Sequence, residues 1–308
     1  MNQTPLLLDS FKQDIPLFSR DGRITYKSVS ASSTTTKACV PPRLLLCSNP
    51  NGDCEWIKEA ESLLQTLRSS SLENTKTAFP FPEVALDTEA ELSGAFDSQI
   101  LQPIFAILHH LWGGKFTCHR ESHSEAADGS KDISMRLYIV FKTANGEQIV
   151  VLELKRRELI RYEDFAKPKY GLPSGLIDRN SPEAAIEERL EAIRSVQGQS
   201  VWKGNAVPFL KQTSKFANGA PGRGCPYVAL FNWDHLQLLK FDKENLGLEK
   251  LAGTPTAGET AELTWISEHN AVHNTDRGGF IRKASIRKAL LGYMLEAFEA
   301  RLGKGKTL

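Results

Sequence analysis

The sequence predicts an α/β protein whose sheet is covered on both faces. Three stretches carry this prediction: an apolar helix over residues 100–112, a β-hairpin over residues 131–157, and a helix followed by a buried strand over residues 209–231. Helical and strand periods therefore alternate along the middle of the chain, which is typical of helices packed against a sheet.

The hairpin is predicted from the alternation of its strands and from its turn. Apolar side chains recur at every second position from residue 133 to residue 141, which is the period of a strand. Asn145-Gly146 is the strongest short-range hairpin signal, because both residues tolerate positive φ. In the second strand, Val150, Leu152 and Leu154 are apolar on one face and Ile149 and Val151 on the other, so we expect this strand to be covered on both sides.

The second strand of the hairpin ends in two charged residues. Glu153 and Lys155 are two positions apart and therefore point to the same face. A carboxylate and an ammonium group at the rim of a buried strand need a partner, a metal ion or water. Mg²⁺ prefers carboxylate oxygens, and a lysine beside it can orient a water molecule. An acid on the neighbouring strand would complete a divalent-cation site, and Asp132 is the acid that the sequence offers.

These residues carry a resemblance to a known family. Asp132, Glu153 and Lys155 form the pattern Asp-(x)20-Glu-x-Lys, which resembles the PD-(D/E)xK nuclease superfamily. Lys131 stands where the family pattern has proline. Within the superfamily, the chain most resembles a fungal-type branch.

The helix downstream of the hairpin extends the resemblance. Gln212 and Phe216 match the Gln-x-x-x-Tyr-like helix that many members carry, with Phe in place of Tyr, and a buried strand follows. The resemblance covers roughly residues 95–242. It implies a restriction-endonuclease-like core, in which helices flank a central mixed sheet and the order is helix, three strands, helix, strand.

The resemblance also implies an activity, which is hydrolysis of phosphodiester bonds in DNA with Mg²⁺ or Mn²⁺ as the cofactor. Asp132 and Glu153 would bind the metal ion. Lys155 would position the attacking water, and Gln212 would orient either this water or the lysine.

Two interpretations remain open for the charged stretch that follows Lys155. Arg156 and Arg157 are candidates for a rim that contacts nucleic-acid phosphates. Alternatively, the stretch is a solvated loop with internal ion pairs.

The register of the hairpin opposes the simplest form of this site. A regular ladder with Asn145-Gly146 as its loop places Glu153 opposite Tyr138, whereas Asp132 lies six residues further along. At ~3.3 Å per residue this separation is roughly 20 Å, so a bulge, a bend or a longer turn has to close the gap. Otherwise the second acid comes from elsewhere, such as Glu89, Glu91 or Asp97.

Two other function classes therefore stay open. One is a nuclease-derived module that binds nucleic acid without cutting it, which the register and the missing proline favour. The other is a protein-interaction domain that uses a terminal helix over residues 281–302. Arginine and lysine residues cluster at the start of this helix, and a nucleic-acid face or a solvated face are both compatible with them.

The predicted domain organisation is a disordered N-terminal arm over residues 1–54 and a single domain over residues 55–308. The arm is predicted because residues 28–37 form a polar, low-complexity tract that cannot bury enough apolar surface to fold. Further amphipathic helices are predicted over residues 56–69 and 181–196. Residues 243–308 are expected to form a helical extension that begins with a long connecting loop.

Composition bounds these hypotheses. A net charge of +1 and 41% hydrophobic residues are ordinary for a globular protein, so nucleic-acid binding would require a local basic patch. The five cysteines show no Cys-x-x-Cys pair, which predicts reduced thiols in an intracellular protein, either nuclear or cytoplasmic. No apolar run is long enough for a membrane span. The oligomeric state is left open.

Overall fold

The computed structural model describes residues 6–13, 15, 39–47, 54–76, 89–125, 134–157, 159–196, 199–218, 224–241, 259–267 and 286–306. In this part of the chain, helices flank an eight-stranded mixed sheet, which confirms the α/β class. Its strands are β1 (Leu44–Cys47), β2 (Phe116–Glu125), β3 (Ser134–Thr143), β4 (Gln148–Leu154), β5 (Leu176–Asp178), β6 (Tyr227–Phe231), β7 (His235–Phe241) and β8 (Thr260–Ser267). They lie in the order β2-β3-β4-β6-β7-β8-β1-β5.

The helices come from stretches spread along the whole chain. They are α1 (Leu7–Ser10), α3 (Glu55–Leu67), α4 (Glu89–Phe96), α5 (Gln102–Trp112), α6 (Tyr162–Ala166), α7 (Glu183–Ser195), α8 (Ala206–Asn218) and α9 (Ile286–Leu302). A π-helical turn, η1 (Asp97–Leu101), joins α4 to α5 without a break. Five of these confirm helices predicted from hydrophobic periodicity, namely α3, α5, α7, α8 and α9.

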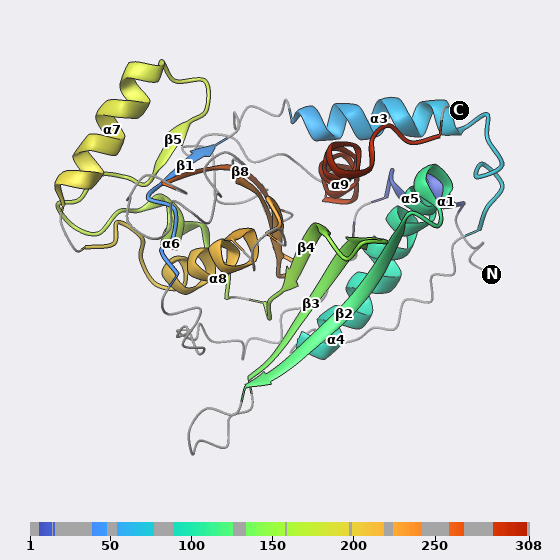
Figure 1. The fold of residues 1–308 in the computed structure, drawn as a ribbon, viewed down its shortest axis with the longest axis horizontal. Helices are drawn as coiled ribbons and strands as arrows, with labels where there is room; N and C mark the ends of the chain where they lie inside the picture. Colours follow the sequence, from blue (N-terminus) through green and yellow to red (C-terminus); the bar gives the residue numbers. More distant parts are fainter. Residues whose placement is uncertain are drawn as a thin grey trace.

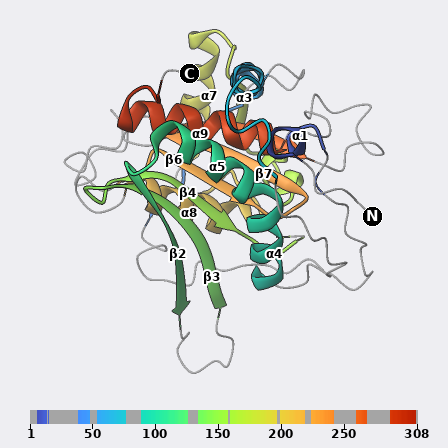
Figure 2. The same ribbon diagram turned by 90° about the vertical axis from the view of Figure 1, so that its right-hand side faces the viewer.

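The two faces of the sheet carry different helices. Figures 1 and 2 show α4, α5 and α9 on one face and α8 on the other. Phe141 of β3 packs against Phe298 of α9, with ring centroids 5.7 Å apart. Tyr138, three residues earlier and therefore on the opposite face, packs against Phe216 of α8 at 5.2 Å. We call these the α9 face and the α8 face.

The β3–β4 hairpin has the register that the sequence predicts, with Glu153 opposite Tyr138. Its turn is longer than predicted, because the amide of Thr143 donates to the carbonyl of Glu147 and only Gly146 has positive φ. A shift in register between Phe141 and Lys142 then offsets the extra loop residue. The loop and the bulge compensate for each other, so the face and height of Glu153 are unchanged.

The predicted disordered arm is wrong for the parts of residues 1–54 that the structure describes. Residues 44–47 form β1, which pairs in parallel with β8 on one side and β5 on the other. Residues 7–10 form α1, and Leu7 and Phe11 are 1% exposed. These short apolar runs are buried by partners far away in the sequence, which a local count of polar residues does not reveal. The polar tract over residues 28–37 lies outside the described residues.

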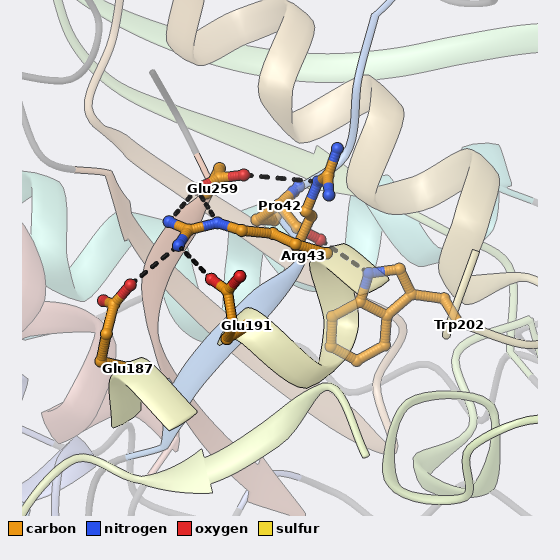
Figure 3. Close-up of polar contacts among 7 residues, drawn as sticks. Pro42, Arg43, Glu187, Glu191, Trp202 and Glu259 are labelled. Atoms are coloured by element: carbon orange, nitrogen blue, oxygen red, sulfur yellow. Dashed lines mark hydrogen bonds and ion pairs between the residues drawn. The ribbon is translucent and has the colours of Figure 1, made fainter. Parts of the chain in front are cut away.

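An ion-pair network holds the N-terminal strand on the sheet (Figure 3). Glu259, just before β8, pairs with Arg43 at 3.5 Å and with Arg194 of α7 at 2.7 Å. Arg194 also reaches Glu187 and Glu191, at 2.8 and 3.2 Å. These contacts connect α7 and the strand β1 through one buried carboxylate, that of Glu259.

The predicted helical extension over residues 243–308 is also only partly correct. Residues 260–267, expected to lie largely in a connecting loop, form β8, which pairs with both β7 and β1. The stretch does alternate over residues 260–265, because apolar Ala261, Leu263 and Trp265 are separated by polar residues, but it stands alone in a long stretch with no other periodic pattern.

The strands β2 and β3 run on beyond the rest of the sheet (Figure 1). Pairing of β3 with β4 starts at Tyr138, whereas residues 134–137 of β3 pair only with β2. None of the helices in the described ranges combines the length and apolar character that a membrane crossing requires.

Candidate active site

Glu153 lies in the middle of the sheet, one residue before the end of β4. Its neighbours across the strands are Tyr138 of β3 and Leu230 of β6. Because Tyr138 packs against α8, Glu153 also points to the α8 face. Its side chain is 1% exposed. The prediction of a carboxylate at the end of a strand covered on both sides is therefore confirmed.

Lys155 and Gln212 meet Glu153 on this face. The backbone amide of Lys155 donates to the carbonyl of Phe231 at 2.8 Å, which continues the β4–β6 pairing past the end of the strand. Its ammonium group forms an ion pair with Glu153 and donates to Oε1 of Gln212 at 3.3 Å. The ammonium also lies 5.4 Å from the ring centroid of Phe209, one helical turn before Gln212.

The electrostatics of the pair follow from its burial. Lys155 is 5% exposed and Gln212 is 4% exposed, so little water screens the two charges. Apart from the ion pair, neither oxygen of Glu153 accepts a hydrogen bond from the residues that the structure describes. A buried carboxylate with spare acceptor sites can bind a cation, because each ionised oxygen has two lone pairs to offer.

The structure does not place Asp132 or Asp97, two candidates for the second acidic ligand, beside Glu153. Asp132 lies outside the described residues. Ser134, the first residue of β3, is four residues beyond Tyr138, or roughly 13 Å along a regular strand. Asp97, the alternative from the preceding helix, packs on the α9 side and pairs with Arg120. It is therefore separated from Glu153 by the sheet.

The two arginines that follow the site have different surroundings. Arg156 is partly exposed, which suits its expected contact with phosphate. Arg157 is 2% exposed and forms two hydrogen bonds to Asp234, at 2.9 and 3.3 Å. The structure therefore gives Arg157 an internal ion pair instead of a free surface, which corrects its predicted role as a phosphate contact.

Sequence reasoning missed Asp234 and Phe209 as parts of this region. Asp234 is 77 residues from Arg157 and follows a strand whose neighbour in the sheet cannot be read from local pattern. Phe209 is the first residue of the helix predicted from residue 209 onwards, with no role in the site assigned to it. The usable signal was its spacing of three residues from Gln212, which puts both side chains on one helical face.

No group of three His, Cys, Asp or Glu side chains in the described ranges is arranged to hold a metal ion. Comparisons of the chain with known protein families, with curated proteins and with solved structures found no match. The class of the protein is thus argued from the residues of the site and the order of the strands alone.

Proposed function

We propose that the protein hydrolyses phosphodiester bonds in nucleic acid, with DNA as the substrate, at a PD-(D/E)xK-type site. The observation that carries this proposal is the meeting of Glu153, Lys155 and Gln212 in a buried cluster. Lys155 and Gln212 come from different elements and are 57 residues apart, yet their side chains are in hydrogen-bond contact.

The order of the elements supports the same class. An antiparallel series β2-β3-β4 is followed by β6, which lies parallel to β4. A helical stretch precedes the series on the α9 face, and α8 connects to β6 on the α8 face. With α6, β5 and α7 inserted between β4 and α8, this order is compatible with the helix, three strands, helix and strand that the resemblance implies.

Each residue of the cluster has a chemical role in this proposal. Glu153 would hold a divalent cation together with oxygens of the substrate phosphate. The cation would supply Lewis-acid stabilisation of the charge that develops on the phosphate. Lys155 would orient the attacking water, and Gln212 would hold the ammonium group in place through its Oε1 atom.

The ion pair between Glu153 and Lys155 determines how a cation would bind in the site. Glu153 is buried and its only charged contact in the described ranges is the Lys155 ammonium. A cation that binds the carboxylate must therefore displace this ammonium group, since like charges repel strongly where water is excluded. The same step would free Lys155 to orient the attacking water.

A second candidate is a related module that binds nucleic acid without cutting it. Its specific support is the closed ion pair together with the extension of β3, which carries the chain away from Glu153. This candidate predicts binding that weakens steeply with salt and does not depend on Glu153.

The test is cleavage of supercoiled plasmid DNA in Mg²⁺ or Mn²⁺ by wild type, Glu153→Gln and Lys155→Met. These substitutions keep the volume of the buried side chains. We expect the wild type to nick the plasmid and both variants to be at least about 100-fold slower, the effect of losing one key electrostatic contact. Glu183→Gln and Lys169→Met are the matched controls, because both residues are exposed.

Equal rates for wild type, Glu153→Gln and Lys155→Met would remove the assignment. Salt-dependent DNA binding without cleavage by any of the five proteins would instead identify the binding module. Circular dichroism of each variant would show whether a lost activity follows from lost folding.

A further inference from the structure

A second buried ion pair lies beside the candidate site. Arg157, two residues after Lys155, donates from Nε to Oδ2 of Asp234 at 3.3 Å and from Nη2 to Oδ1 at 2.9 Å. Arg157 is 2% exposed and Asp234 is 4% exposed. The pair connects the segment that leaves β4 to the turn between β6 and β7.

This turn has an unusual backbone. Trp233 has φ of 73°, a left-handed conformation that a bulky side chain rarely adopts. Such a conformation persists only where the surroundings impose it. Here the indole ring is 2% exposed and packs against Phe231, and the amide of His235 donates to Oδ1 of Asn232 at 2.8 Å. The neighbouring Asp234 adds the two hydrogen bonds from Arg157.

Stability alone does not account for a buried pair of this kind. The cost of removing two charges from water is often as large as their attraction, so apolar residues of similar volume can be equally stable. What the pair does supply is direction, because two parallel hydrogen bonds from a planar guanidinium group fix both partners in orientation.

The position of the pair indicates what it orients. The bond from the Lys155 amide to the Phe231 carbonyl joins the two strand ends directly after the regular ladder. Arg157 follows Lys155 by two residues, and Asp234 follows Phe231 by three. The ion pair therefore joins the segment after β4 to the segment after β6, just beyond this hydrogen bond. At such positions the ends of paired strands otherwise separate most easily.

We propose that Arg157 and Asp234 are positioning residues for the candidate site, an inference that rests on the proposed function. By holding the β6–β7 turn against the segment after β4, they fix the backbone of Lys155. The ammonium group then reaches Glu153 and Gln212 together. Neither Arg157 nor Asp234 contacts substrate in this arrangement.

The test compares wild type with the double variant Arg157→Met/Asp234→Leu, which replaces the pair by apolar side chains. We expect a Tm within a few degrees of wild type. Hydrogen exchange of the Lys155 amide should be at least 10-fold faster, whereas that of Leu152, earlier in β4, should not change. In the plasmid assay, kcat should fall about 100-fold, the effect of a misplaced group, with KM for DNA changed less than threefold.

Arg157→Lys keeps the charge but loses the two-pronged geometry, so it should show intermediate exchange at Lys155. It also provides the test if the double variant does not fold. Unchanged exchange at Lys155 in a folded variant would overturn the positioning role, and so would a large rise in KM at constant kcat, which is the mark of a phosphate contact. If wild type cuts no DNA but exchange at Lys155 responds, the proposed nuclease function fails while the positioning role stands.

Discussion

Glu153 shows how one residue can combine a structural cost with a chemical use. It lies between Tyr138 and Leu230 in the middle of the sheet, and Lys155 is its charged partner in the described part of the chain. Removing one member of a buried ion pair leaves the other charge uncompensated, which costs about 3–5 kcal/mol. A cation bound to Glu153 would restore that compensation.

Lys155→Met should therefore respond to Mn²⁺ more strongly than wild type does. In the variant, Mn²⁺ would neutralise an unpaired carboxylate, whereas in wild type it must first displace the ammonium group. We expect thermal unfolding to show a larger rise in Tm on adding Mn²⁺ for Lys155→Met than for wild type. The double variant Glu153→Gln/Lys155→Met is the control and should not respond. Equal Mn²⁺ responses in wild type and Lys155→Met would contradict a cation site at Glu153.

For single residues, prediction from the sequence succeeded where the position of a side chain follows from the local pattern. Glu153 and Lys155 follow from alternation along a strand, whereas Gln212 was expected only from the resemblance to the Gln-x-x-x-Tyr-like helix. Arg157 was misjudged because its partner, Asp234, is brought to it only by the pairing of β4 with β6. A charged residue next to a strand end has the same local pattern whether it faces solvent or a buried partner.

Among the elements, the crossing of α3 and α9 is the closest helix contact that a substitution can test. A Cβ atom built at Gly292 of α9 would lie 1.9 Å from the backbone oxygen of Trp56 in α3. Gly292→Ala must push the two helices apart, which costs about 1–3 kcal/mol or more. Chemical denaturation should show this loss.

The matched control for that substitution is Gly94→Ala in α4, another helical glycine. A Cβ atom there meets nothing within 4 Å. Because alanine loses less conformational freedom than glycine on folding, this variant should be neutral or up to about 1 kcal/mol more stable. A Gly292→Ala variant as stable as Gly94→Ala would contradict the close approach of α3 and α9.

The same two helices should make stability depend on pH. Burial raises the pKa of Glu59 in α3 to about 7 from 4.5, and the neighbouring carboxylates Glu299 and Glu296 add to the shift. Between these values the unfolded chain has lost the proton that the folded protein still holds, so stability falls as pH rises and then levels off above about 7.

Glu59→Gln removes this titration. Relative to wild type, the Tm of the variant should rise by on the order of 2–4 °C between pH 4.5 and pH 8. Thermal scans across this range measure the difference, and Glu73→Gln, at an exposed position after α3, is the control. A constant difference between Glu59→Gln and wild type at all pH values would show that Glu59 has an ordinary environment.

Elements were predictable where their pattern is local. The helices α3, α5, α7 and α8 have an apolar stripe, α9 is buried around most of its circumference over residues 286–298, and the β3–β4 hairpin has alternation and a turn signal. The strands β1, β5 and β8 escaped prediction. The first two are four and three residues long, too short for alternation to be recognised, whereas β8 alternates over residues 260–265 but stands alone in a long stretch with no other periodic pattern.

For the molecule as a whole, the largest correction is that the N-terminal region belongs to the sheet. Leu45 of β1 is fully buried and pairs with Leu176 on one side and Ala261 on the other. Leu45→Ala should therefore cost about 2–5 kcal/mol, as expected for a core leucine. Val40→Ala, in the same segment but 68% exposed, should change stability by no more than about 0.5 kcal/mol. Urea titrations of both variants would test this, and a neutral Leu45→Ala would restore the view of a dispensable arm.

The place of β1 also sets an order for synthesis on the ribosome. Its partner strand β8 is translated about two hundred residues after it, roughly 10–40 s later at 5–20 residues per second. During that interval the nascent chain carries an unpaired apolar strand, which is the kind of segment that chaperones bind. The sheet is completed only once β8 has been translated.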